Sequence, residues 1–184
     1  AINPLASLHA MRGDVDLAER LLRQANETLA ELAGFNTTVN HHEGLVWLFA
    51  GRPERVESAL RPAVATLQAM GDGALLATTS AMLAQAAYAL GRFEDARSDC
   101  RVAAGAAAAD DILTQVVWRG VLAKVLARDG SYDRAEALAR EAVALAEPTD
   151  LLVHKADAML DLGEVLRLCS RPAEARDAIV VGLA

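Results

Sequence analysis

The sequence contains few aromatic residues. Aromatic side chains make up 4% of the 184 residues, whereas alanine is the commonest residue by a wide margin. Alanine has the highest helix propensity, and strands are enriched in aromatic and β-branched residues, so this composition argues against a β-sandwich. Because 53% of the residues are hydrophobic and 23% are charged, we expect a folded all-α protein rather than a disordered chain.

Cysteine and positive charge are also scarce. Cys100 and Cys169 are the only cysteines and lack CxxC spacing, so we expect buried free thiols and a reducing, cytoplasmic location. The net charge of −7 repels nucleic acid and anionic membranes. We therefore expect neither nucleic acid nor a membrane as a partner.

One segment lacks charge altogether. Residues 73–91 carry no charged side chain over 19 positions, a length that reaches a membrane span. Polar residues such as Thr78 and Gln85 interrupt it, and alanine outnumbers leucine and isoleucine, so we expect a buried helix. The N-terminus has no basic region followed by an apolar core, and we expect no signal peptide.

Nucleotide, hydrolase and zinc motifs are missing. Neither GxxxxGK[ST] nor GxSxG occurs in the sequence. The nearest metal-like string is "NHHEG", which contains His41 and His42, but HExxH requires a second histidine where Val46 stands. Two adjacent histidines point in different directions on a helix, so we expect no metal and no cofactor.

Paired carboxylates have simpler explanations than acid–base catalysis. Asp110 and Asp111 are predicted to cap the helix that follows them. Asp157 and Asp161 are spaced i, i+4 near the start of another helix, where we expect both to be solvated. We therefore expect no catalytic residues and no enzymatic activity.

What the sequence does contain is a repeated turn. A turn residue followed by a short polar run occurs at Gly13, Gly51, Gly91, Gly130 and Ser170, at intervals of 38, 40, 39 and 40 residues. A nearly constant period of this length is typical of helical repeat proteins.

The residues around each turn predict two helices. Positions five, eight, nine and twelve after the turn are apolar or small in all five units, with Asp99 as the one polar exception. This i, i+3, i+4, i+7 spacing is that of an amphipathic helix with one buried face. The position seven before the turn is always small, which allows two helices to approach closely; it holds Ala6, Gly44, Ala84, Ala123 and Gly163.

Each unit is therefore a helix, a tight turn and a second helix. The predicted helices span residues 4–11, 14–33, 37–50, 53–70, 74–90, 93–108, 110–129, 132–147, 150–169 and 172–184.

The small positions and turns resemble those of the tetratricopeptide repeat. The strings that carry the resemblance are Leu162-Gly163, Gly91-Arg92-Phe93, Gly130-Ser131-Tyr132 and Pro148, although the period is near 40 rather than 34. The resemblance implies a right-handed superhelical solenoid of about five antiparallel helix pairs, forming a single domain over residues 1–184.

Residues 114–172 also resemble the helical repeat arrays that lie C-terminal to nucleotide-binding modules in bacterial ATPase-linked adenylate or guanylate cyclases and transcriptional activators. This similarity implies a signalling or regulatory context. The last predicted helix ends without a polar capping helix, with Ile179 and Val181 facing an absent neighbour. We expect either a fragment of a larger protein or open ends that meet a second copy.

In tetratricopeptide superhelices the first helix of each pair lines a concave groove, which implies a set of partner-binding candidates. Lys124 and Arg128 are expected to form a positive spot for an acidic peptide or a carboxylate, and reversing both charges is predicted to abolish capture while leaving thermal stability nearly unchanged. The candidates are Thr38, His41, Leu45, Leu48, Gln85, Tyr88, Lys124, Arg128, Asp157, Glu164 and Arg167.

The resemblance thus implies a non-catalytic protein–protein interaction module whose partner is a protein, a peptide or another domain of its parent chain. The alternative is a small-molecule sensor. A closed pocket near Tyr88 and Trp118 would favour the sensor.

Overall fold

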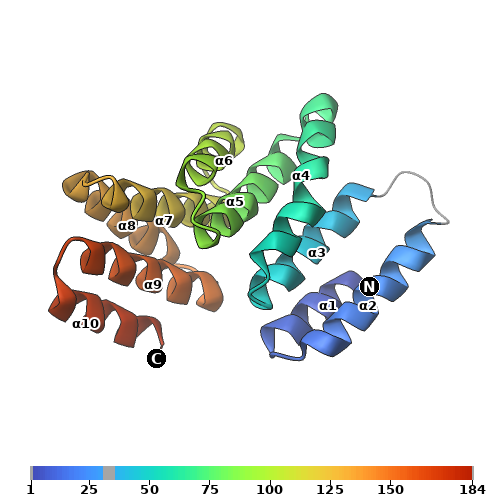
Figure 1. Cartoon of the computed structure of the whole chain (residues 1–184), viewed down its shortest axis with the longest axis horizontal. Coiled ribbons are helices and arrows are strands. Elements are labelled where there is room, and N and C mark those ends of the chain that lie inside the picture. The colour runs from blue at the N-terminus through green and yellow to red at the C-terminus, as the bar shows by residue number, and fades with distance from the viewer. Residues whose placement is uncertain (1, 31–35, 184) are drawn as a thin grey trace.

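The chain folds into a curved array of antiparallel helix pairs (Figure 1). The computed structural model describes the backbone of residues 2–30 and 36–183, and the side chains of 2–28 and 41–183. Within these residues there are ten helices and no strand: α1 (Ile2–Met11), α2 (Val15–Ala30), α3 (Asn36–Phe49), α4 (Pro53–Met70), α5 (Gly73–Ala89), α6 (Phe93–Ala106), α7 (Ile112–Arg128), α8 (Tyr132–Ala146), α9 (Leu152–Leu168) and α10 (Pro172–Gly182).

The helix limits predicted from the repeat are confirmed. Every predicted limit that falls on described residues lies within two residues of the observed one. Differences of two residues occur at the start of α1, on both sides of the link from α6 to α7 and at the start of α9. At the link, Ala107 adopts an extended conformation and ends α6 early.

The five repeated turns share one hydrogen-bond pattern. In each, the residue after the turn donates its backbone N–H to the carbonyl five residues earlier, as from Arg92 to Ala87, at 2.9 Å in all five. This Schellman-type end requires a left-handed residue, and Gly91 (φ 74°) supplies it without a Cβ penalty. Ser170 adopts the same conformation (φ 60°) in the fifth turn.

The small positions lie where paired helices touch. An added Cβ on Gly44 would stand 2.7 Å from Leu60 of the partner helix, and one on Gly163 would stand 2.6 Å from Ile179. The other members of this set are fully buried alanines. The predicted close approach of the two helices in each unit is therefore confirmed.

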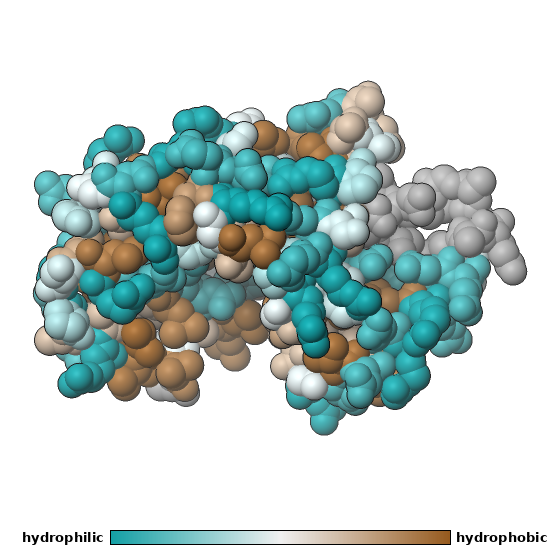
Figure 2. Space-filling model, in the orientation of Figure 1, coloured by the Kyte–Doolittle hydropathy of each residue, from teal (hydrophilic) through white to brown (hydrophobic). Residues whose placement is uncertain are grey.

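First helices form an inner layer and second helices an outer one. Each first helix contacts the first helix of the next unit, and from α3 onward it also contacts the second helix of the unit before. The array curves so that α9 and α10 return toward α1 and α2 (Figure 1). Figure 2 shows the resulting hollow, with hydrophobic surface along both of its sides.

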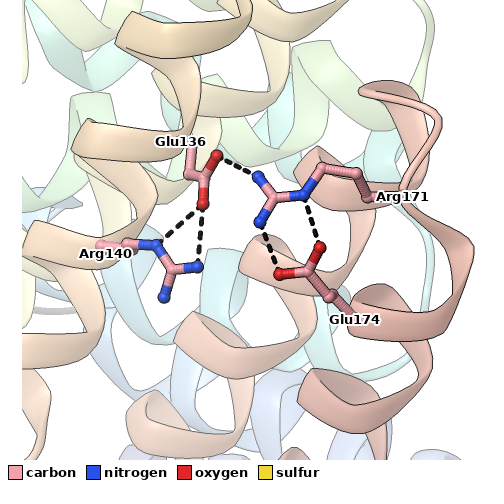
Figure 3. A network of polar contacts seen from close by, with 4 residues as sticks. All are labelled: Glu136, Arg140, Arg171 and Glu174. Atoms are coloured by element: carbon pink, nitrogen blue, oxygen red, sulfur yellow. Dashed lines mark hydrogen bonds and ion pairs between the residues drawn. The ribbon is translucent and has the colours of Figure 1, made fainter.

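Ion pairs link consecutive units along the outer layer. Glu57, six residues after its turn, pairs with Arg92, the first residue after the next turn, at 2.6 Å. Glu136 pairs with Arg171 in the same register, and Arg140 and Glu174 extend this network (Figure 3). These contacts are exposed or half-buried, so each contributes little to stability alone.

Asp99, the polar exception in the apolar stripe, has a structural explanation. Its residue exposure is 8%, and it accepts two hydrogen bonds from Arg61 of the preceding unit at 2.7 and 3.0 Å. Burial raises the pKa of Asp99, whereas Arg61 acts to lower it. A bidentate guanidinium thus compensates the buried carboxylate.

The apolar segment 73–91 is the buried helix that the sequence predicts. Most residues of α5 are buried by its neighbours. Among the described helices, none combines the length and the hydropathy that crossing a membrane requires.

Candidate partner-binding groove

The inner layer encloses a groove of about 640 Å³. All five first helices contribute to its lining, from Ser7 and Met11 on α1 to His154 and Asp157 on α9. Because α1 and α9 belong to the first and last units, the curvature of the whole array creates this groove.

Most of the lining is apolar. Its side chains include Leu45, Leu48, Met82, Leu113 and Val117 from three different helices. Such surfaces bind apolar groups of a partner because burial removes apolar area from water.

Large apolar side chains are also exposed at the edges of the groove. Met11 of α1 is 45% exposed and Phe49 at the end of α3 is 38% exposed. Leu151, the N-cap of α9, is 36% exposed, and Leu152, the first residue of that helix, is 75% exposed. Exposed apolar side chains that gather around one concavity are typical of an interaction site.

The structure divides the predicted groove residues into two groups. Five of them line the apolar groove: His41, Leu45, Leu48, Gln85 and Asp157. The side chain of Thr38 lies outside the described residues. A separate polar cluster contains Tyr88, Lys124, Arg128 and Glu164, with Arg167 at its exposed edge.

The polar cluster corrects the expectation of a free positive spot. Lys124 on α7 pairs with Asp161 on α9 at 2.5 Å, and the two side chains are only 13% and 19% exposed. Gly120 permits this approach, because a Cβ there would overlap the Asp161 carboxylate. The expectation that Asp161 is solvated is therefore wrong, and Lys124 already has its counter-ion.

Arg128 is also committed to internal contacts. It donates to the Tyr88 hydroxyl at 2.7 Å and to Glu164 at 3.3 Å, and its guanidinium lies 4.7 Å from the centre of the Phe93 ring. The Tyr88 hydroxyl in turn donates to Glu164 at 2.6 Å. Burial and the carboxylate of Glu164 raise the pKa of Tyr88. The cluster therefore ties α5, α7 and α9 together.

These contacts also change the expected effect of reversing both charges. Glutamate at position 124 would face Asp161 in a largely buried site, and glutamate at 128 would face Glu164. Uncompensated charges of this kind are strongly destabilising. The double reversal should therefore lower thermal stability, contrary to the expectation from sequence.

Asp157 differs from Asp161 in having no cation of its own. No lysine or arginine of the described residues lies within ion-pair distance of its carboxylate. Burial and, to a smaller extent, the charge of Asp161 raise the pKa of Asp157 to about 6, although Lys124 opposes both effects. A charged, half-buried carboxylate therefore faces the groove.

The histidines of the groove add no positive charge at neutral pH. Burial lowers the pKa of His41, and His42 lowers it further. Burial also lowers the pKa of His154. The charged groups of the lining are thus Asp150 and Asp157, so the groove has negative character.

Metal ligands are not clustered among the described residues, and the buried thiol of Cys100 is not activated. No cluster of three or more His, Cys, Asp or Glu side chains suits a metal ion there. Burial raises the pKa of the Cys100 thiol to about 12, which keeps it protonated.

The aromatic residues that would mark a sensor pocket are used internally. The Trp118 indole donates to Gln115 at 3.1 Å and lies beneath Arg119 at 4.3 Å. Tyr88 is held by Arg128 and Glu164. Neither Tyr88 nor Trp118 lines the apolar groove.

Several lining residues were not singled out from the sequence, namely Met11, Asp150, Leu151, Leu152 and His154. Leu151-Leu152 offers one signal, since an apolar pair stands at a predicted helix start where polar residues are usual. The Lys124–Asp161 ion pair also had a signal in the sequence. The two residues have opposite charges and are about one repeat apart, which places them at similar positions on the first helices of consecutive units.

Comparison with known proteins supports the repeat assignment. Two tetratricopeptide repeat models match the chain, one over residues 118–147 and the other over 4–24 and 77–98. No curated protein matches it.

Solved structures of similar fold include BtubC (BKLC) from P. vanneervenii, which is 20% identical with a TM-score of 0.69 over 98% of this chain and 76% of that one. Another is a putative kinesin light chain with nearly identical TPR-like repeats from Podosopora anserina, 16% identical with a TM-score of 0.68 over 98% and 91%. At these identities the likeness concerns the fold. The repeat matches and the shared architecture show that this chain is a tetratricopeptide-like helical repeat array.

Proposed function

We propose that the chain is a non-catalytic interaction module whose groove binds a segment of a partner protein or of another domain of its parent. The observation that carries the proposal is the apolar groove lined by all five first helices, with Met11, Phe49 and Leu152 exposed around it. Tetratricopeptide-like arrays generally serve as protein-interaction scaffolds, which is consistent with this surface.

A preformed groove favours the binding of short segments. Its helices are held by buried cores within and between units, so little of its own order has to be acquired on binding. Affinity then arises from burying small apolar patches along successive helices.

The resemblance of residues 114–172 to repeat arrays of bacterial ATPase-linked cyclases and transcriptional activators supports a regulatory setting for this module. In that setting the groove would couple a partner to a signalling output in the cytoplasm.

A small-molecule sensor is the second candidate. The groove volume of about 640 Å³ and its apolar lining are within the range of small-molecule sites. A ligand there would contact both ends of the array and could alter its curvature.

Peptide display on the immobilised chain tests the proposal. Random peptides would be selected on the wild type and measured against Leu151→Ser/Leu152→Ser, which removes apolar side chains at the groove edge. The matched control is Val180→Ser/Val181→Ser, because these valines of α10 are 61% and 62% exposed and do not line the groove.

We expect the groove-edge variant to lose peptide binding and the control to retain it. Equal binding by both variants would place the interaction elsewhere. If native mass spectrometry instead shows a small molecule that occupies the wild type and is lost from the groove-edge variant, the sensor becomes the better assignment.

A further inference from the structure

The charges of the groove indicate what kind of segment fits it. Asp150 and Asp157 are its acidic residues, and no lysine or arginine belongs to the lining. His41 and His154 are held neutral by burial, so neither offsets this charge. An occupant with negative charge would meet carboxylates in a partly desolvated setting, which is unfavourable.

Asp157 is the focus of this charge. It lies on α9 one helical turn before Asp161, and both carboxylates are near Lys124 of α7. Lys124 bonds to Asp161 at 2.5 Å and reaches no comparable contact with Asp157. One ammonium group therefore serves two carboxylates, and the second is left facing the groove.

Among the described residues, Lys124 is the cation whose charge acts on Asp157, and it is bonded to Asp161. Lys155, two residues before Asp157 on α9, forms no ion pair with it and does not line the groove. We therefore expect a cation that pairs directly with Asp157 to come from the occupant of the groove.

We propose that the occupant is an apolar peptide segment carrying a lysine or arginine whose cationic group pairs with Asp157, while the flanking apolar side chains contact the groove walls. This inference rests on the proposed function, and it specifies the partner's chemistry. Such a cation would gain a charge-assisted hydrogen bond and would give an otherwise uncompensated carboxylate its counter-ion.

The test begins with the peptides selected on the wild type. Lysine and arginine should be enriched among them, and aspartate and glutamate depleted. A selected peptide would then be synthesised with its lysine retained, replaced by norleucine or replaced by glutamate, and binding measured by fluorescence anisotropy. We expect the lysine peptide to bind about tenfold more tightly than the norleucine peptide, and the glutamate peptide to bind most weakly.

Asp157→Asn connects this preference to one residue. The variant and the wild type should bind the norleucine peptide with equal affinity. The variant should bind the lysine peptide no more tightly than it binds the norleucine peptide. Asp177→Asn is the matched control, since it makes the same charge change on the exposed surface of α10 outside the groove. Asp150→Asn is a second groove variant and should cause a smaller loss.

The outcomes separate the two proposals. Peptides that bind in the groove with no preference for lysine or arginine, or with a preference that Asp157→Asn leaves intact, would overturn the inference and leave the interaction module standing. Failure to select any groove-dependent peptide would overturn both.

Discussion

Asp99 in the outer layer is buried and Asp157 in the inner layer is half-buried, but only Asp99 has a bonded counter-ion. Arg61 donates two hydrogen bonds to Asp99 and compensates its charge. Asp157 has only a share of Lys124, which is bonded to Asp161. Burial is the first cause of the raised pKa in both carboxyl groups.

The difference indicates what each layer does. A buried charge whose counter-ion lies in a neighbouring unit joins the two units together. A half-buried charge without one is costly for the folded chain alone, and an external cation would relieve that cost. Five predictions test this contrast, from the largest expected effect to the smallest.

Replacing Lys124 should have the largest effect. Lys124→Met keeps the alkyl chain but leaves Asp161 and Asp157 close together without a cation, in a site where Lys124 is only 13% exposed. We expect a loss of about 3 kcal/mol in the free energy of unfolding, measured by urea denaturation at neutral pH. Recovery in the double variant with Asp161→Asn would identify charge as the cause. A loss that persists in the double variant would indicate packing instead.

Arg61→Met should destabilise the chain less. It leaves Asp99 buried without its guanidinium, but Arg61 itself is 45% exposed, so solvent softens the loss. We expect about 1–2 kcal/mol by the same measurement. An effect as large as that of Lys124→Met would mean that the outer and inner carboxylates are equally dependent on their cations.

Asp157→Asn should stabilise the chain, in contrast to Arg61→Met. The variant removes a charge that burial disfavours, and we expect a gain of about 1–2 kcal/mol at neutral pH, allowing for partial solvent access. The midpoint of thermal or urea unfolding measures it. A loss of stability would mean that the charge of Asp157 has a stabilising partner, as the charge of Asp99 does, and would contradict this prediction.

Lowering the pH should reduce the stability advantage of Asp157→Asn over the wild type. The folded-state pKa of Asp157 is raised from 3.8 to about 6, so its charge destabilises the fold fully above the raised value and less as pH falls toward the lower one. Asp161 on the same helix and Lys124 on α7 influence this titration, with His41 and His154 also facing the groove. The difference in the free energy of unfolding between the wild type and Asp157→Asn should therefore become smaller as the pH falls from about 7 to about 5.

If this difference in the free energy of unfolding stayed constant over that range, Asp157 would not titrate between about pH 7 and pH 5. The same protonation should weaken a bound lysine peptide as pH falls through about 6, because the ion pair needs the charged carboxylate. Anisotropy titrations of the wild type and of Asp157→Asn provide the comparison, since the variant should lack this pH dependence.

The groove itself was only partly predictable. Leu45, Leu48 and Gln85, which the resemblance places among the groove candidates, belong to the first helices and line this pocket. Leu151 and Leu152 line it as well, although they stand at the very start of a first helix, because the curvature of the array brings that end toward α1 and α3. A curvature summed over several unit interfaces has no local signal in the sequence.

The sequence by itself determined the repeat, the helices and their turns, since each depends on neighbours a few residues apart. Gly91 ends a helix because it tolerates a positive φ, and Gly44 lets Leu60 approach because it has no Cβ. Only the tertiary structure decided which charges are free. Lys124 and Asp161 meet across two helices, and that contact turned an expected positive spot into a compensated pair and left Asp157 to face the groove.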